Sequence, residues 1–154
     1  MRRSAHLLEV LDLGTSATVD FLGTVSQAGE ESKLTIFPEY CEALEGLGSF
    51  SHVIILYWLH KRDTPEERKV LKVTPRRHPG APQVGVFASR SPTRPNPIAY
   101  EVCRILNIEG CALTIEGSDA IEGTPIIDLK PYLPRADSVP DARVPEWTKH
   151  GPKT

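Results

Sequence analysis

The sequence lacks any long apolar run and any strong excess of charge of one sign. Its longest apolar run, Val53 to Leu59, is far too short to span a bilayer. The formal net charge is −2, so nucleic-acid binding would have to depend on a local basic patch. A chain of 154 residues suits one domain of ordinary size, which can bury a core without metal ions or disulfides.

The N-terminus lacks the features of a signal peptide. Arg2 and Arg3 precede an apolar stretch, but Glu9 and Asp12 interrupt it and no small-residue cleavage site follows. We therefore expect a soluble, cytoplasmic protein that does not enter a membrane. Residues 1–18 are expected to form a short N-terminal extension with one or two helical turns.

Cysteine is scarce and widely spaced. The three residues are Cys41, Cys103 and Cys111, with no CxxC pair and no nearby histidine pair, so we expect no zinc or other metal site. Three separate thiols fit a reducing cytoplasm, and we expect them to be buried and structural.

The common catalytic and nucleotide-binding motifs are also missing. The sequence has no P-loop, no HExxH and no GxSxG, and it shows no internal repeat. The stretch "GLGSFS" (46–51) resembles part of a dinucleotide fingerprint, but it follows a predicted helix and precedes a strand, which is the reverse of the required order. Its glycines are better explained as the end of the helix.

The apolar pattern predicts a mainly β protein. Strands are expected at 19–25, 33–37, 53–59, 69–73, 84–87, 98–108, 111–117 and 125–131, and a short helix at 38–48. The unbroken run 53–59 predicts a central strand covered on both faces. Because helical crossovers are mostly missing, we expect a compact antiparallel β-barrel with one or two short helices, not a Rossmann fold. The barrel should cover 19–134, followed by an extended tail at 135–154.

The stretch "FASRSPTRPNPIAY" (87–100) is unusually rich in proline and arginine. Each of its three prolines fixes one backbone angle, and each restricts the residue before it to extended conformations. Arg90 and Arg94 can each bind a carboxylate or phosphate with two parallel donors, and Asn96 adds a small polar group. The pattern predicts a preorganised anion site, and a rigid surface turn with locally paired arginines remains the alternative.

Two further segments hold candidate site residues. Asp128 and Lys130 lie two residues apart on one face of a short strand, where they would either face a ligand or form a surface ion pair. His60 and Lys61 end the central strand, at a rim where ligands are often bound, although a strand-end histidine often only hydrogen-bonds locally. Between Lys61 and Arg77, seven basic residues outnumber three acidic ones, which is typical either of a phosphate-contacting patch or of a solvated face.

Three segments together resemble the TsaA-like proteins, the TrmO family of tRNA methyltransferases. They are "GVFASRSPTRPNPIAY", "EGTPIIDLKPYLP" and the central strand "GLGSFSHVIILYWLH", and the resemblance runs from about Val19 to Pro134. It implies a β-barrel that binds S-adenosylmethionine without a Rossmann fold, and a homodimer with the cofactor near the subunit interface. It also implies methylation of the exocyclic amine of threonylcarbamoyl-adenosine beside the tRNA anticodon.

The resemblance assigns the cofactor contacts to individual residues. These positions are His60, Lys61, Arg90, Tyr100, Gly123, Thr124 and Pro125. From the chemistry of the side chains, we expect Arg90 and Asp128 to be catalytic. We also expect the tRNA or its modified base to be bound by Arg76, Arg77, Arg94, Asn96 and Lys130.

The chain departs from the family pattern at two places. The family carries a Thr-Pro-Arg-Gln-like loop after the first strand, and here that region is the short, acidic "GTVSQAGEESKLTIF". Tyr100 stands where the family has an aliphatic residue. Two alternatives therefore stay open: a methyltransferase for another RNA or a small molecule, and a non-catalytic module that binds S-adenosylmethionine or tRNA.

Overall fold

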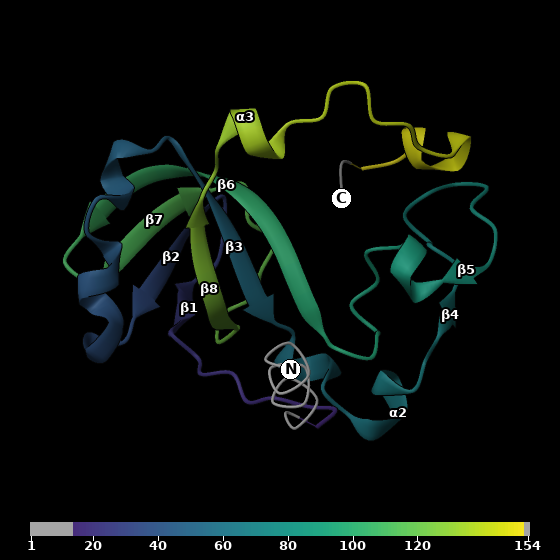
Figure 1. Ribbon diagram of the computed structural model, residues 1–154, viewed down its shortest axis with the longest axis horizontal. Coiled ribbons are helices and arrows are strands. Elements are labelled where there is room, and N and C mark those ends of the chain that lie inside the picture. Colours follow the sequence, from purple (N-terminus) through teal and green to yellow (C-terminus); the bar gives the residue numbers. More distant parts are fainter. Residues whose placement is uncertain (1–13, 153–154) are drawn as a thin grey trace, which may run out of the picture.

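The computed structural model describes residues 14–152, and its centre is a closed antiparallel barrel (Figure 1). The strands follow the order β1-β2-β7-β6-β3-β8, and β8 pairs back onto β1. Their bounds are β1 Gly23–Gln27, β2 Glu31–Ile36, β3 His52–Trp58, β6 Ile98–Glu109, β7 Ala112–Glu116 and β8 Pro125–Pro131. The predicted fold class, a mainly β, antiparallel barrel with few short helices, is confirmed.

Alternation along the strands places the core inside this barrel. In β2, every second residue is buried, as expected for a strand with one face in a core and one in water. The central strand β3 pairs with β6 on one side and β8 on the other, which explains its unbroken apolar run. The fully buried side chains of the core include Val25, Leu34, Val53, Ile55, Tyr57, Cys103, Leu113, Ile115 and Ile126.

A second body of chain extends from one side of the barrel, on the right in Figure 1. We call residues 60–97 the arm; it leaves the barrel after β3 and returns at the start of β6. The arm contains η3 (His60–Arg62), α2 (Pro65–Arg68), β4 (Lys72–Val73), β5 (Val84–Gly85) and η4 (Val86–Ala88). Strands β4 and β5 pair only with each other, so the predicted strands at 69–73 and 84–87 are shorter and lie outside the barrel.

The C-terminal tail follows α3 (Pro134–Asp137) and lies along the arm. Near its end, η5 (Glu146–Lys149) brings Trp147 edge-on to the His78 ring, with 5.6 Å between ring centroids. The His78 ring nitrogen Nδ1 is 2.9 Å from the carbonyl oxygen of His150. Trp147 therefore packs on the arm of its own chain rather than on the barrel.

Two further predicted elements also differ in the structure. The first strand begins at Gly23 rather than at 19, although the Leu22 amide already donates to the Ile126 carbonyl of β8 at 2.8 Å. The predicted helix at 38–48 is two 3₁₀ segments, η1 (Pro38–Leu44) and η2 (Leu47–Ser49), separated by Gly46 in the left-handed conformation (φ 86°). A left-handed glycine ends a helix, as predicted for this stretch. The expected helical turns of residues 1–13 lie outside the described residues.

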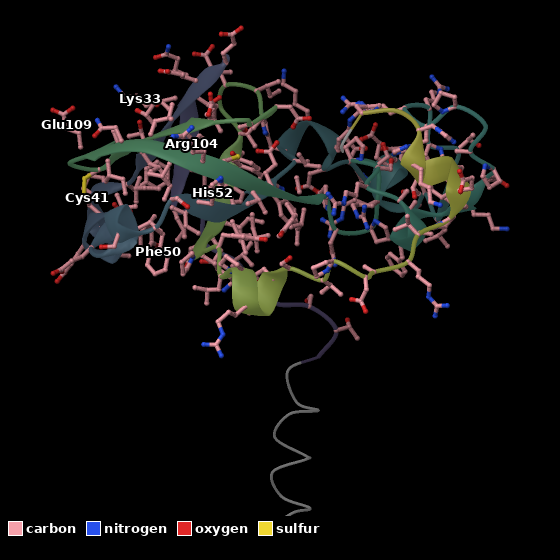
Figure 2. All side chains as sticks on the ribbon, turned by 90° about the horizontal axis from the view of Figure 1, so that it is seen from above. Lys33, Cys41, Phe50, His52, Arg104 and Glu109 are labelled. Carbon is pink, nitrogen blue, oxygen red and sulfur yellow. A yellow bond between two sulfur atoms is a disulfide. The ribbon has the colours of Figure 1, made fainter. Side chains whose placement is uncertain are left out.

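The prediction of three buried thiols is wrong for two of the cysteines. Cys41 in η1 and Cys111 in the turn before β7 form a disulfide across a sequence separation of 70 residues, and only Cys103 is a buried free thiol. Figure 2 shows Cys41 at the end of the barrel that lies away from the arm. The spacing of the cysteines gave no sign of this pairing, because only the closed barrel brings η1 beside the β6–β7 turn.

Candidate functional site

The proline-rich loop at 89–97 is held mainly by its own side chains. Arg94 folds back and donates hydrogen bonds to the carbonyl oxygens of Ser89 and Ser91, both at 3.1 Å. The hydroxyls of the same two serines accept from the backbone amides of Ser91 and Thr93. Pro97 is buried, and its carbonyl oxygen accepts from the Leu59 amide at 2.7 Å. The loop is therefore as rigid as its prolines predict, and the Arg94 guanidinium is engaged within it.

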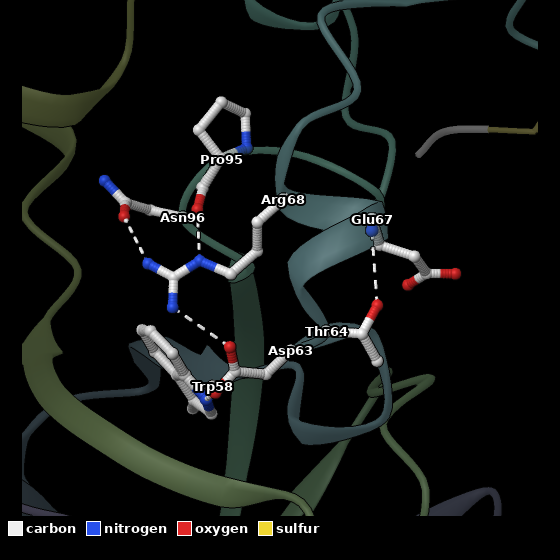
Figure 3. A network of polar contacts seen from close by, with 7 residues as sticks. All are labelled: Trp58, Asp63, Thr64, Glu67, Arg68, Pro95 and Asn96. Atoms are coloured by element: carbon white, nitrogen blue, oxygen red, sulfur yellow. Dashed lines mark hydrogen bonds and ion pairs between the residues drawn. The ribbon is translucent and has the colours of Figure 1, made fainter.

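Arg68 of helix α2 fixes the same loop from outside (Figure 3). Its Nε donates to the Pro95 carbonyl at 2.8 Å, and its two terminal nitrogens donate to Asn96 Oδ1 at 3.3 Å and Asp63 Oδ1 at 3.0 Å. The guanidinium also lies 5.8 Å from the centre of the Trp58 ring. Only a planar, forked donor can reach three such acceptors at once. The basic stretch had indicated a general patch, and this specific role of Arg68 was not predicted.

The outer face of the barrel brings Arg90, Tyr100 and Asp128 together. In the strand register, Asp128 of β8 lies opposite Leu56 of β3, and Leu56 lies opposite Tyr100 of β6. Tyr100 and Asp128 thus stand on one row, two strand spacings or about 10 Å apart. The Arg90 guanidinium lies 5.8 Å from the centre of the Tyr100 ring. Three residues that the sequence placed in separate segments form one surface.

Lys130 belongs to the next row of this face, where it lies opposite Ile54. Its Nζ is 2.8 Å from Asp128 Oδ2, so the predicted same-face relation is confirmed and the two side chains form an ion pair. The hydrogen bond to Asp128 raises the pKa of Lys130 above its usual value. Asp128 Oδ1 also accepts from the Leu129 amide at 2.9 Å. The Asp128 carboxylate is therefore oriented on the surface and still partly accessible.

The other predicted site residues lie around this face. His60 and Lys61 are exposed in η3, directly after the central strand, and Arg76 is exposed in the arm. Arg77 lies 3.7 Å from Asp119 in the β7–β8 loop, and so connects the arm to that loop. Gly123 has a left-handed conformation (φ 84°) and, with Thr124 and Pro125, joins the loop to β1 and β8. None of the contacts above joins these residues directly to Arg90, Tyr100 or Asp128.

An apolar pocket of about 310 Å³ lies at the end of the barrel that η1 and η2 cover. It opens where β8 diverges from β1, and its lining includes Leu22, Leu44, Leu47, Phe50, Asp128 and Pro131. Asp128 thus borders both the pocket and the outer face. Because the pocket forms only when η1 and η2 cover the gap between strands, the sequence pattern gave no sign of it.

A half-buried carboxylate was also missed. Glu101 occupies an inward position of β6 and contacts Ser118 and the Asp119 amide, at 2.7 and 3.0 Å. The signal was available, because the β6 alternation puts residues 99, 101 and 103 on one side and a glutamate there interrupts an apolar face. Within residues 14–152 no cluster of three potential metal ligands occurs, and no helix has the length and apolar character to cross a membrane.

The chain is similar to proteins of one family. Residues 23–138 match the tRNA-methyltransferase O N-terminal domain. A probable S-adenosyl-L-methionine-binding protein of Methanothermobacter thermautotrophicus is 45% identical over 112 residues, which are 73% of this chain and 77% of that protein. A putative S-adenosylmethionine-dependent methyltransferase, RcsF, of Pseudomonas aeruginosa is 46% identical over 102 residues, covering 66% of this chain and 43% of RcsF.

Solved structures give the same picture. The crystal structure of TrmO from Pseudomonas aeruginosa aligns with a TM-score of 0.65 and 31% identity, over 84% of this chain and 61% of that one. A second TrmO crystal structure aligns with a TM-score of 0.67 and 33% identity, over 84% and 64%. The chain therefore spans less than two thirds of the length of these two crystallised proteins.

Proposed function

The chain belongs to the family of the tRNA-methyltransferase O N-terminal domain, and from this premise we propose that it is an S-adenosylmethionine-dependent methyltransferase. The acceptor that we propose is the exocyclic N6 amine of threonylcarbamoyl-adenosine beside the tRNA anticodon. The single observation that carries the proposal is the row of Arg90, Tyr100 and Asp128 on the outer face, beside a loop that is rigid before any ligand binds.

The side chains of this face suit the chemical groups of S-adenosylmethionine. An arginine donates well to a carboxylate, an aspartate accepts from an amine or from ribose hydroxyls, and an exposed aromatic ring packs on a purine. When bound, the cofactor supplies a methyl group activated by its sulfonium. His60, Lys61 and the Gly123–Pro125 segment are proposed to complete the cofactor site.

Methyl transfer is an in-line displacement whose main demand is the placement of the nucleophile about 3–3.5 Å from the methyl carbon. The Arg68 and Arg94 contacts hold the proline-rich loop in one conformation, which reduces the entropy cost of this placement. We propose that Arg90 binds the carboxylate of the threonyl group or of the cofactor. We propose that Asp128 orients the acceptor amine and takes up its proton, releasing Lys130 from the ion pair.

Calorimetry with S-adenosylmethionine and its demethylated product tests the cofactor directly. We expect both compounds to bind. Arg90→Ala should weaken binding or single-turnover methylation at least tenfold, because it removes one charge-assisted hydrogen bond. Arg104→Ala is the matched control, since Arg104 is an exposed arginine of β6 with no assigned role in the site. Unchanged single-turnover methylation by Arg90→Ala and Asp128→Ala would show that the assigned roles are wrong.

We also propose that the protein forms a homodimer through the outer face of β6. Four apolar side chains project from that strand with substantial exposure: Ile98 40%, Tyr100 45%, Val102 38% and Leu106 38%. A strand that is apolar on both faces is typical of one that is covered on both faces. Light scattering should give a dimer mass for the wild type and a monomer mass for Val102→Asp. A monomeric wild type would contradict this part of the proposal.

The proposed tRNA contacts lie on the arm and, through Lys130, on the neighbouring face of the barrel. Of its basic residues, Arg62, Arg68 and Arg77 already form ion pairs with neighbouring carboxylates. We propose that Lys130, Asn96 and the exposed Lys69, Lys72 and Arg76 contact the RNA, the three basic arm residues mainly through phosphates. Replacing the lysines at 69 and 72 by glutamine should reduce the salt dependence of tRNA binding by about one phosphate contact each.

The short connection between β1 and β2 favours a second candidate for the methyl acceptor. Strands β1 and β2 are joined by only residues 28–30, where the family carries its Thr-Pro-Arg-Gln-like loop. That loss favours another RNA or a small molecule as acceptor, or a module that binds without turnover. Mass spectrometry of nucleosides from a deletion strain distinguishes these cases, since the methylated threonylcarbamoyl-adenosine should disappear only if the tRNA proposal holds.

A tRNA substrate implies a cytoplasmic protein, whereas disulfides are uncommon in a reducing cytoplasm. Alkylation of thiols during cell lysis, followed by mass spectrometry, shows whether Cys41 and Cys111 are joined in the cell. A closed disulfide in cells would place the protein in an oxidising environment and would count against the proposed location.

A further inference from the structure

Glu101 stands in an unusual place for a carboxylate. It occupies an inward position of β6, between Ala99 and the buried Cys103, while its neighbours Tyr100 and Val102 project from the outer face. A carboxylate in such a position costs stability unless it is well hydrogen-bonded. Its partners therefore indicate what it does.

All of the Glu101 partners but Cys103 belong to the loop between β7 and β8. Its Oε2 accepts from the Ser118 hydroxyl at 2.7 Å, and its Oε1 accepts from the Asp119 amide at 3.0 Å. The Cys103 sulfur lies 3.8 Å from Oε2. One carboxylate thus binds two successive residues of the loop, from a strand that is 17 and 18 positions away in the sequence.

The Ser118 hydroxyl links Glu101 to Tyr57 in a hydrogen-bond chain whose donor direction is determined. Ser118 Oγ accepts from the Ala120 amide at 3.1 Å and lies 3.1 Å from the Tyr57 hydroxyl oxygen. A hydroxyl has one proton and two lone pairs. Because Ser118 gives its proton to Glu101, the buried Tyr57 must donate to Ser118. The ionised carboxylate of Glu101 is the final acceptor of a chain that runs from Tyr57 through Ser118.

The far end of the loop is fixed to the barrel separately. The Gly123 amide donates to the Val25 carbonyl at 2.8 Å, and the Val25 amide donates to the Thr124 carbonyl at 3.0 Å. The loop is therefore attached to the barrel at two points, at Glu101 through residues 118–120 and at Val25 through residues 123–124. Loosening the first point leaves the second, and the exposed Arg77–Asp119 ion pair to the arm, to hold the segment that precedes β8.

We propose that Glu101 is a positioning residue, whose ionised carboxylate fixes the β7–β8 loop and with it the Gly123–Pro125 edge of the cofactor site. The inference rests on the proposed function, because it concerns the same cofactor. Glu101 acts through Ser118 and Asp119 and does not itself touch the ligand. Glu101 and its neighbour Tyr100 point to opposite faces of β6. One strand therefore supports the β7–β8 loop from its inner face and carries Tyr100 of the proposed cofactor site on its outer face.

The protonation of Glu101 would weaken this contact. Burial, with a further contribution from the Asp119 side chain, raises the pKa of Glu101 to about 6. Burial also raises the pKa of the neighbouring Tyr57 and that of Cys103, to about 12 for the thiol, so both stay neutral. The remaining charged neighbours are Asp119 and, beyond it, Arg77 at 3.7 Å. A protonated Glu101 can still accept through its carbonyl oxygen, but the oxygen that carries the proton becomes a donor and the contacts to Ser118 and Asp119 lose their charge assistance.

The test combines cofactor affinity with a direct measurement on the loop. Calorimetry with S-adenosylmethionine at pH 7.5 and 5.0 would compare the wild type, Glu101→Gln and Ser118→Ala. Glu109→Gln is the matched control, because it removes an exposed carboxylate from the same strand. The nitrogen and proton shifts of the Asp119 amide would be followed over the same pH range.

We expect Glu101→Gln and Ser118→Ala to bind about tenfold more weakly than the wild type at pH 7.5, the effect of losing a charge-assisted hydrogen bond. The wild type and the Glu109→Gln control should weaken similarly on acidification, with a midpoint near the pKa of about 6. Glu101→Gln should lose this pH dependence. The chemical shifts of the Asp119 amide should change with the same midpoint in the wild type and should not change in Glu101→Gln.

Two different failures are distinguishable. If the wild type does not bind S-adenosylmethionine at pH 7.5, the proposed function fails, and the assignment of Glu101 to a cofactor site fails with it. If the wild type binds and Glu101→Gln binds within twofold of it, only the positioning role is overturned. A pH dependence that persists in Glu101→Gln would equally overturn it, since another titratable group would then be responsible.

Discussion

Arg68 offers the sharpest test of the idea that the proline-rich loop is held rigid from outside. In Arg68→Lys, a single ammonium replaces a guanidinium that contacts Pro95, Asn96 and Asp63 at once. A lysine can keep the ion pair with Asp63 but cannot span the three acceptors. The substitution therefore keeps the charge and removes the clamp.

The expected loss can be estimated from the contacts. A hydrogen bond from a charged donor contributes about 1.5–3 kcal/mol when buried, and the Arg68 side chain is 40% exposed, so the Pro95 bond is assigned about 1 kcal/mol. The contact over Trp58 adds about 0.5 kcal/mol at an exposed site. Loop opening should therefore become easier by about 1–2 kcal/mol, a 5- to 30-fold change in the opening equilibrium.

Amide hydrogen exchange measures this opening directly. The amides of Leu59 and Ile98 donate to the carbonyls of Pro97 and Asn96, both at 2.7 Å, and should exchange 5- to 30-fold faster in the variant, while barrel amides remain unchanged. Arg62→Lys is the control, because Arg62 pairs with Glu67 in the same segment and, among the contacts of residues 14–152, does not touch the proline-rich loop. Exchange within twofold of the wild type, or an equal effect of Arg62→Lys, would refute the clamp.

Three further predictions concern stability. Because the folded-state pKa of Glu101 is raised from 4.5 to about 6, its contribution to stability is present below pH 4.5 and is lost as the pH rises through 6. In urea melts, the unfolding free energy of Glu101→Gln minus that of the wild type should be about 1 kcal/mol larger at pH 7.5 than at pH 4.5, after a discount for the partial exposure of Glu101. A difference that does not change with pH would contradict the raised pKa. The Cys41–Cys111 disulfide closes a 70-residue separation, so Cys41→Ser should lower the unfolding free energy by about 3–4 kcal/mol, and reduced wild type should match it in denaturant melts. A methyl group on Gly23 would overlap the backbone of β2, so Gly23→Ala should cost about 1–3 kcal/mol, whereas Gly48→Ala, with its nearest neighbouring atom at 4.0 Å, serves as the tolerated control in thermal melts.

The sequence by itself determined the elements whose causes are local. The unbroken run at 53–59 gave the central strand, and the two β-prone runs around residues 109–110 gave the β6–β7 hairpin, because side-chain periodicity and turn residues act over a few positions. The rigidity of the proline-rich loop followed from the fixed φ of each proline. The shared face of Asp128 and Lys130 followed from the two-residue period of a strand.

Only the tertiary structure decided which residues meet. Arg68 contacts a loop 27 residues away, and Tyr57 contacts Ser118 across 61 residues. The row of Arg90, Tyr100 and Asp128 depends on the order of β6, β3 and β8 in the barrel and on their register. The disulfide likewise depends on where η1 packs. Local patterns carry no information on such pairings, because the energy that selects them comes from closing the barrel and burying its core as a whole.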